Sequence, residues 1–349
     1  MAKTLDRETE RPLFLRGPHL VPFWASSLLG VIMLRSAERA GEAPPAVLTS
    51  TVPREYVHRA AVSEVFLTGW QRTGADDFTV SAQWPRSHSF YRTGRTRYDP
   101  LLLCETVRQA PALLMHAAYL VPFGHQMIWT RFRFTADPRA LRIERRPAEL
   151  QLYVTCSRMR RIRGVPAAVT MEFQVMRGSE PLGSAVTSFT CHSPAVYRRM
   201  RGERGDAARV FGEVSEPAPP LPPGEVGRLI PEDVVLSPSV PAGRPGGWTL
   251  RVDTSHPVLF DHPVDHVPGM LLLEAVRQAT HALGSRSDMG MPIVMDVEFH
   301  RYVEFDSPCT ITAEPQPSRA ADSRRTVCIK GVQGEATAFT ARAEVRGGH

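Results

Sequence analysis

The chain has 349 residues, 42% of them hydrophobic and 22% charged, which is enough for two domains of ordinary size and typical of a soluble globular protein. Its formal net charge of +6, with many arginines, suits an acidic partner such as a phosphorylated substrate or an acidic carrier protein. Its five scattered cysteines include no CxxC spacing, which excludes a disulfide framework or a cysteine zinc site and indicates a cytoplasmic location.

Residues 1–47 are predicted to form an N-terminal extension. The apolar stretch over 21–34 contains two serines and a glycine and is too short for a transmembrane helix. No small-residue cleavage site follows it, so a signal peptide is not expected. No helix-turn-helix or zinc pattern is present either, and we therefore expect neither a membrane nor a nucleic acid as partner.

Two domains are predicted after the extension, at residues 48–200 and 228–349, joined by a proline-rich linker at 201–227. In the first, a short helix or strand entry over 57–67 precedes a helix over 100–119; in the second, a helix is predicted over 269–283. Apolar and polar residues alternate as in half-buried strands. Such strands are predicted over 78–84, 126–134, 149–160, 167–177, 181–191, 248–253, 293–305, 308–314, 325–332 and 336–345.

One pattern occurs twice, because residues 98–110 align with residues 267–279 at a constant offset. Glu105, Arg108 and Gln109 match Glu274, Arg277 and Gln278, and both sets share one helix face. The chain is therefore an internal duplication. Each unit is predicted as an α+β domain with one central helix and an antiparallel sheet.

The second copy follows a histidine-rich turn, Asp261-His262-Pro263-Val264-Asp265-His266-Val267-Pro268-Gly269. A histidine turn, Pro-Gly and a helix with Glu-Ala-x-x-Gln resemble the hotdog-fold β-hydroxyacyl-carrier-protein dehydratases. The two copies together, over about residues 48 to 345, resemble more closely the A-factor biosynthesis hotdog-repeat family of actinobacteria.

This resemblance implies a tandem hotdog fold, in which each antiparallel sheet wraps around a central helix and the two units form a pseudo-dimer. It also implies an acyltransferase. A β-ketoacyl group would pass from acyl carrier protein, or from CoA, to the hydroxyl of dihydroxyacetone phosphate, giving the precursor of a γ-butyrolactone-type signalling molecule. We expect no cofactor, and whether the pseudo-dimer associates further stays open.

Acyl transfer from a thioester to an alcohol needs a base, donors for the developing oxyanion and cations for the phosphate. As catalytic residues we predict Glu274, His262, Glu105, His266 and Asp265. Burial at the start of the two helices is expected to raise the pKa of both glutamates and so make them usable bases. The amides near Leu101 and Met270 are candidate donors to the thioester oxygen.

For substrate binding we predict Arg277, Arg108, Gln278, Gln109, Gly269, Asp261, Tyr98 and His88. The two arginines are candidate phosphate ligands. By analogy with the dehydratases, His262 would meet Glu105 and His88 would meet Glu274. The second turn has two Asp-His pairs and the first has none, so the two sites are expected to be unequal.

Plainer interpretations stand beside these. Each glutamate could form only an ion pair with the arginine three residues on. The turn contains metal-ligand types, but Pro263 and Pro268 disfavour a regular helix there, and no metal site is predicted. The alternatives to an acyltransferase are a hotdog dehydratase or thioesterase acting on acyl thioesters, and a non-catalytic acyl-binding regulatory module.

Overall fold

The structure is a computed structural model that describes residues 50–92, 96–239, 246–284, 291–317 and 324–346. The predicted extension at 1–47 lies outside these residues. No helix in the described part is long and apolar enough to cross a membrane.

Within the described residues, one antiparallel sheet of twelve strands has the order β1-β2-β4-β5-β6-β3-β9-β12-β11-β10-β8-β7. The strands of the first unit are β1 (Leu67–Arg72), β2 (Asp77–Trp84), β3 (Gln126–Ala136), β4 (Ala148–Ile162), β5 (Val165–Arg177) and β6 (Glu180–His192). Those of the second are β7 (Leu236–Pro238), β8 (Gly247–Leu250), β9 (Pro292–Phe299), β10 (Cys309–Pro315), β11 (Arg324–Gln333) and β12 (Ala336–Arg346).

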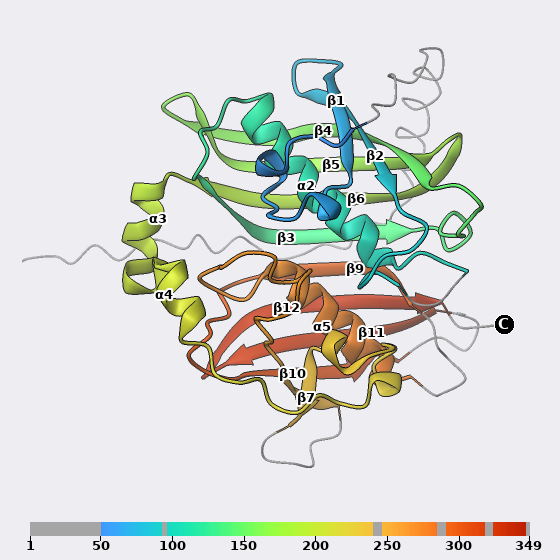
Figure 1. The fold of residues 1–349 in the computed structure, drawn as a ribbon, viewed down its shortest axis with the longest axis vertical. Coiled ribbons are helices and arrows are strands. Elements are labelled where there is room, and N and C mark those ends of the chain that lie inside the picture. The colour runs from blue at the N-terminus through green and yellow to red at the C-terminus, as the bar shows by residue number, and fades with distance from the viewer. Residues whose placement is uncertain (1–49, 93–95, 240–245, 285–290, 318–323, 347–349) are drawn as a thin grey trace, which may run out of the picture. The chain divides into compact units, whose positions relative to one another are not determined.

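The two units meet where β3 pairs with β9, from Arg131 opposite Glu298 to Thr135 opposite Val294. Counted outwards from this seam, the first half has the order β3-β6-β5-β4-β2-β1 and the second half has the order β9-β12-β11-β10-β8-β7. The two units therefore have the same strand topology. Helix α2 (Pro100–Ala117) lies against the first half and helix α5 (Gly269–Ala282) against the second (Figure 1). The predicted tandem hotdog fold is thereby confirmed.

Binary patterning explains why these segments form a sheet wrapped around helices. In β4, Leu150, Leu152 and Val154 are buried and their neighbours are more exposed, so one face of the strand turns inwards. α2 is buried on nearly all sides, because the sheet curves around it. Side chains of α2 and α5 belong to one continuous apolar core.

Short helices fill the regions where the sequence signals were weakest. The 3-10 turn η1 (Arg54–Val57) precedes the stretch predicted as a helix or strand entry over 57–67, and that stretch contains the 3-10 turn η2 (Val62–Glu64). The end of the first domain and the linker contain α3 (Pro194–Arg201), η3 (Gly202–Gly205), α4 (Ala207–Gly212) and η4 (Pro223–Glu225), and η5 (Pro231–Asp233) follows. β8 and β9 end earlier than predicted, at Leu250 and Phe299.

Candidate active site

A buried carboxylate lies at the centre of each unit. In the second unit, Glu274 accepts hydrogen bonds from Arg228 at 2.8 Å, Arg277 at 2.8 and 2.9 Å, and Gln278 at 2.5 Å. In the first, Glu105 accepts from Arg59 at 3.0 Å, Arg108 at 2.8 Å and Gln109 at 2.7 Å. Each glutamate is fully buried between two arginines.

These arginines decide the protonation state of the two carboxylates. Burial alone raises the pKa of Glu274, but Arg228 and Arg277 outweigh it and hold that pKa at about 2. Burial likewise raises the pKa of Glu105, and Arg108 and Arg59 bring it to about 2. The expectation that burial would raise the pKa of both glutamates was wrong, because the second arginine of each cluster was not anticipated.

The glutamines and histidines of the repeat complete the same frame in both units. Gln109 binds the amide of Phe66 and the carbonyl of Glu64, as Gln278 binds Val235 and Asp233. His88 accepts from two backbone amides through Nδ1 and meets Glu64 through Nε2 at 3.2 Å. His256 and Asp233 repeat this arrangement. His88 is therefore paired with Glu64 rather than with Glu274, its predicted partner.

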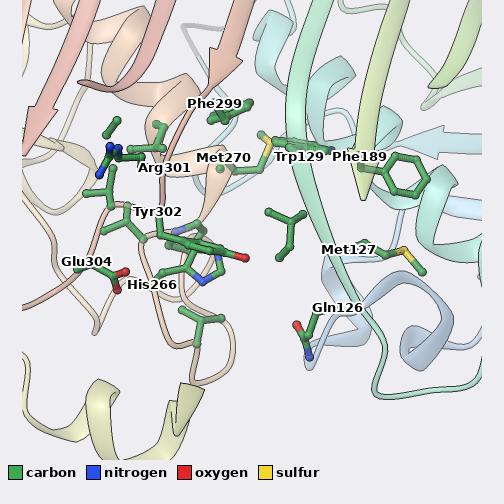
Figure 2. A pocket seen from close by; sticks show the side chains of 18 of the residues that line it. Gln126, Met127, Trp129, Phe189, His266, Met270, Phe299, Arg301, Tyr302 and Glu304 are labelled. Atoms are coloured by element: carbon green, nitrogen blue, oxygen red, sulfur yellow. The ribbon is translucent and has the colours of Figure 1, made fainter. Parts of the chain in front are cut away.

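A cavity of about 820 Å³ opens between the two units. Its walls come from β3 and α2 of the first unit and from the start of α5 and the loops around 258–267 and 300–307 of the second. Figure 2 shows His266 and Tyr302 on one side of it and Gln126, Met127 and Phe189 on the other. Its apolar lining includes Met127, Trp129, Phe189, Met270 and Phe299.

Two Asp-His pairs line or support this cavity. Asp261 lies 2.5 Å from Nδ1 of His262, and Asp265 lies 2.7 Å from Nδ1 of His266. A carboxylate at Nδ1 fixes the tautomer and leaves Nε2 as the ring atom available to a substrate. Both histidines line the cavity.

Each aspartate is held in place by other side chains. Asp261 also accepts from the amide of Ala60 at 2.9 Å and lies 3.5 Å from Arg59. His262 is thereby linked to Glu105 through Asp261 and Arg59, whereas a direct meeting was predicted. Asp265 accepts from the hydroxyl of Tyr197 at 2.7 Å and from Arg201 at 3.0 Å, both on α3. Burial raises the pKa of Asp265, but His266, Tyr197 and Arg201 lower it to about 2.

The two central helices begin differently. Asp99 caps α2 by accepting from the amide of Leu101 at 2.9 Å, and Pro100 brings no amide proton. The Leu101 amide is thus already occupied. α5 follows Pro268 with no side-chain cap, and its first residues line the cavity. A Cβ at Gly269 would lie 2.6 Å from the ring of Trp129, so glycine lets the indole pack on the helix start.

The family model described as the A-factor biosynthesis hotdog domain matches residues 42–193 and 213–347. The chain belongs to this family. It is 46% identical over 301 residues to a 2-oxo-3-(phosphooxy)propyl 3-oxoalkanoate synthase of Streptomyces virginiae, covering 86% of this chain and 99% of the relative. Synthases of that name from Streptomyces griseus and Streptomyces coelicolor are each 40% identical, over 82% and 88% of this chain and 92% and 95% of their own lengths.

Only part of the predicted site of this hotdog-family chain reaches the cavity. Arg108, Asp261, His262, His266 and Gly269 line it. Asp265 is buried behind His266. The others are built into the two frames or the core: Glu105, Glu274, Arg277, Gln109, Gln278, Tyr98 and His88. In the described residues, no group of three or more His, Cys, Asp or Glu could hold a metal ion.

Sequence reasoning missed four residues that matter here: Arg59, Arg228, His58 and His116. Arg59 and Arg228 cross between the units, because Arg59 donates to the carbonyl of Val258 at 2.9 Å and Arg228 to that of Phe90 at 2.7 Å. The sequence did contain a signal for these two arginines, because the constant offset that relates Glu105 to Glu274 also relates Arg59 to Arg228.

Proposed function

We propose that this chain transfers a 3-oxoacyl group from a thioester to the hydroxyl of dihydroxyacetone phosphate. The names of its relatives describe a 3-oxoalkanoate ester whose alcohol part is 2-oxo-3-(phosphooxy)propyl. The free alcohol of that group is dihydroxyacetone phosphate. The observation that carries the proposal is the cavity at the uncapped start of α5, which combines an apolar wall, two Asp-His pairs and a cationic end.

The acyl group fits the apolar part of the cavity. Met127, Trp129 and Phe299 would contact its chain, and the first amides of α5 would face the thioester oxygen. Amides at a helix start stabilise negative charge, which develops on that oxygen as the tetrahedral intermediate forms. His266 lies shortly before Gly269, the first residue of α5, and is placed to donate to the same oxygen when its ring is protonated, with Asp265 behind it.

The acceptor fits the end formed by Arg108 and His262. Arg108 binds Glu105 through Nε and Nη2, which leaves Nη1 outside these bonds. Arginine is well suited to a phosphate, and the His262 ring, backed by Asp261, adds a second donor through Nε2 when it carries both protons. Arg277 does not line the cavity and is fully engaged with Glu274, Val226 and Gly227, so we assign it a structural role.

Glu105 and Glu274 are proposed to hold the frames rather than to act as bases. A dehydratase of the hotdog type would need one of them as a proton donor or acceptor beside the substrate. Both are fully buried, ion-paired and ionised, since their pKa values are about 2. This observation favours acyl transfer over the dehydratase alternative.

For the donor we propose an acyl carrier protein thioester, which the net charge of +6 suits, with acyl-CoA as the substitute. The ester would serve as the precursor of a γ-butyrolactone-type signalling molecule. The direct test is mass spectrometry of the protein incubated with a 3-oxoacyl thioester, with and without dihydroxyacetone phosphate. A phosphorylated ester that forms only with both supports the proposal. Release of the same free acid in both tubes indicates a thioesterase, and no conversion indicates a binding module.

The helix start can be tested separately with Pro268→Asp. The Pro268 backbone, at φ −61° and ψ 143°, resembles that of Asp99 at φ −68° and ψ 129°, so the new carboxylate should cap α5 as Asp99 caps α2. We expect kcat to fall about 100- to 1,000-fold, the cost of losing an oxyanion donor. Pro268→Ala is the control, because it removes the ring without adding a carboxylate. Equal rates for the two variants would contradict the role of the α5 amides.

A further inference from the structure

His58 occupies a backbone conformation that is costly for a histidine. It has φ 52° and ψ 53°, in the left-handed region. Its counterpart in the second unit, by the offset that relates Arg59 to Arg228, is Gly227 with φ 67°. The second unit thus makes the same turn with glycine. Residues held in such conformations cluster at functional sites.

The two units also place an imidazole differently. A Cβ on Gly227 would lie 2.8 Å from Nδ1 of His281 in α5. The counterpart of His281 in α2 is Ala112, whose small side chain leaves room beside the turn. In the first unit the imidazole therefore belongs to the turn, and both His58 and Ala112 line the cavity.

Hydrogen bonds fix which nitrogen of His58 carries a proton. His116 lies 2.7 Å from the carbonyl of Val121 through Nδ1, and a carbonyl only accepts, so His116 donates there. Its Nε2 is then an acceptor, and it lies 2.7 Å from Nε2 of His58. His58 must donate through Nε2. Its Nδ1 is left as an unprotonated acceptor.

The charges around His58 keep the ring neutral. Burial has the largest effect, and the charges of His116, Arg108 and His262 add to it. Together they lower the pKa of His58 to about 3. Arg59 follows in sequence, and its partners Glu105 and Asp261 complete the charged groups at this end of the cavity. A neutral imidazole with a fixed lone pair, beside groups that suit a phosphate, is arranged to receive a proton.

We propose that His58, which lines the cavity beside Arg108 and has its tautomer fixed by His116, is the base that deprotonates the acceptor hydroxyl when the phosphate of the acceptor is bound at Arg108. The inference rests on the proposed function. The hydroxyl oxygen attacks the thioester carbon as its proton passes to Nδ1 of His58. The C–S bond then breaks, and the leaving thiolate takes up the proton, so that an ester and a free thiol result.

The phosphate dependence follows from charge. A dianionic phosphate bound at Arg108 offsets the field of that cation, and the protonated form of His58 becomes easier to reach. Without the acceptor, His58 stays a weak base and activates water poorly. The arrangement therefore favours transfer to the phosphorylated alcohol over hydrolysis of the thioester.

His58→Gly is the informative variant, because glycine suits the turn and opens space for added imidazole. We expect kcat for ester formation to fall about 100- to 10,000-fold, with partial recovery in imidazole. Arg163→Gly is the matched control, since Arg163 also has a positive φ, of 51°, lies exposed in a hairpin and does not line the cavity. Full activity of His58→Gly overturns the proposal, as does a loss that imidazole leaves unchanged and that accompanies loss of folded protein.

The role of the phosphate is tested with dihydroxyacetone as acceptor, with and without inorganic phosphite. Phosphite should accelerate ester formation in the wild type but not in His58→Gly. Equal acceleration in both proteins overturns the coupling to His58. The proposed function fails in a different way, because then the wild type forms no ester with any acceptor.

Discussion

The start of α2 and the start of α5 are equivalent by sequence and opposite in chemistry. Asp99 and Pro100 close the first helix, whereas Pro268 and Gly269 leave the second one open to the cavity. The glutamate, arginines and glutamine below them are the same in both units and make the same bonds. The repeated residues therefore hold the fold, and Arg59 and Arg108 of the first unit also line the cavity, where residues that differ between the units gather.

The same division underlies our proposal that the repeated glutamates are structural rather than catalytic. Glu105 and Glu274 were predicted to be catalytic because they repeat on buried helices. Their repetition has a structural cause, since each one neutralises two arginines. Two histidines that reach the cavity, His58 and His266, are not repeated, because Gly227 and Arg97 stand at the equivalent positions.

The largest change in stability is expected when either of the two buried glutamates is replaced. Glu105→Gln and Glu274→Gln should each lower the free energy of unfolding by about 3–5 kcal/mol, because each leaves a buried arginine, Arg59 or Arg228, without its carboxylate. The loss should be smaller for Glu105→Gln, because the side chain of Arg108 is 21% exposed and that of Arg277 is 2% exposed. Urea unfolding followed by circular dichroism measures them.

Glu335→Gln is the control for this pair, because Glu335 is exposed in the turn after β11. It should change stability by less than about 0.5 kcal/mol. A Glu274→Gln protein that is as stable as the wild type but forms no ester would return Glu274 to the role of base.

Low pH should destabilise both units over the same pH range. The pKa of Glu105 and of Glu274 is held at about 2 in the folded protein, below the ordinary value of 4.5. Each therefore contributes stability that is complete above pH 4.5 and is lost as the pH falls towards 2, on the order of 3 kcal/mol apiece. Asp265, also lowered to about 2, adds to the same acid limb.

Urea midpoints at pH 6, 4.5 and 3.5 test this dependence. We expect the midpoint to change little between the first two values and to drop at the third. In Glu105→Gln and Glu274→Gln the drop should be smaller, because one of the titrating carboxylates is gone. A wild-type midpoint that is flat down to pH 3 would show that the ion pairs contribute little.

Local sequence signals predicted most of the elements and the duplication, and the family resemblance implied their arrangement as a tandem hotdog fold. Alternation predicted most strands, and the constant offset between residues 98–110 and 267–279 predicted the duplication. The site depended on long-range contacts. Arg59 and Arg228 each lie 46 residues before the glutamate they neutralise, in segments of 3-10 turns with weak periodicity. The pKa of the glutamates could not be inferred without them.

The smallest effect tests the turn that the two units share. Gly227→Ala should lower the free energy of unfolding by about 1–2 kcal/mol, because a Cβ is disfavoured at φ 67° and would lie 2.8 Å from Nδ1 of His281. Adding His281→Ala should recover the part due to contact and leave the backbone part. Gly224→Ala, where nothing lies within 4 Å of the added carbon, is the control for glycine replacement itself. If the backbone part remains, the first unit bears a similar cost at His58, and a stable fold alone gives no reason to keep a histidine there. If Gly227→Ala is as stable as the wild type, the turn tolerates a side chain freely and the conformation of His58 ceases to indicate function.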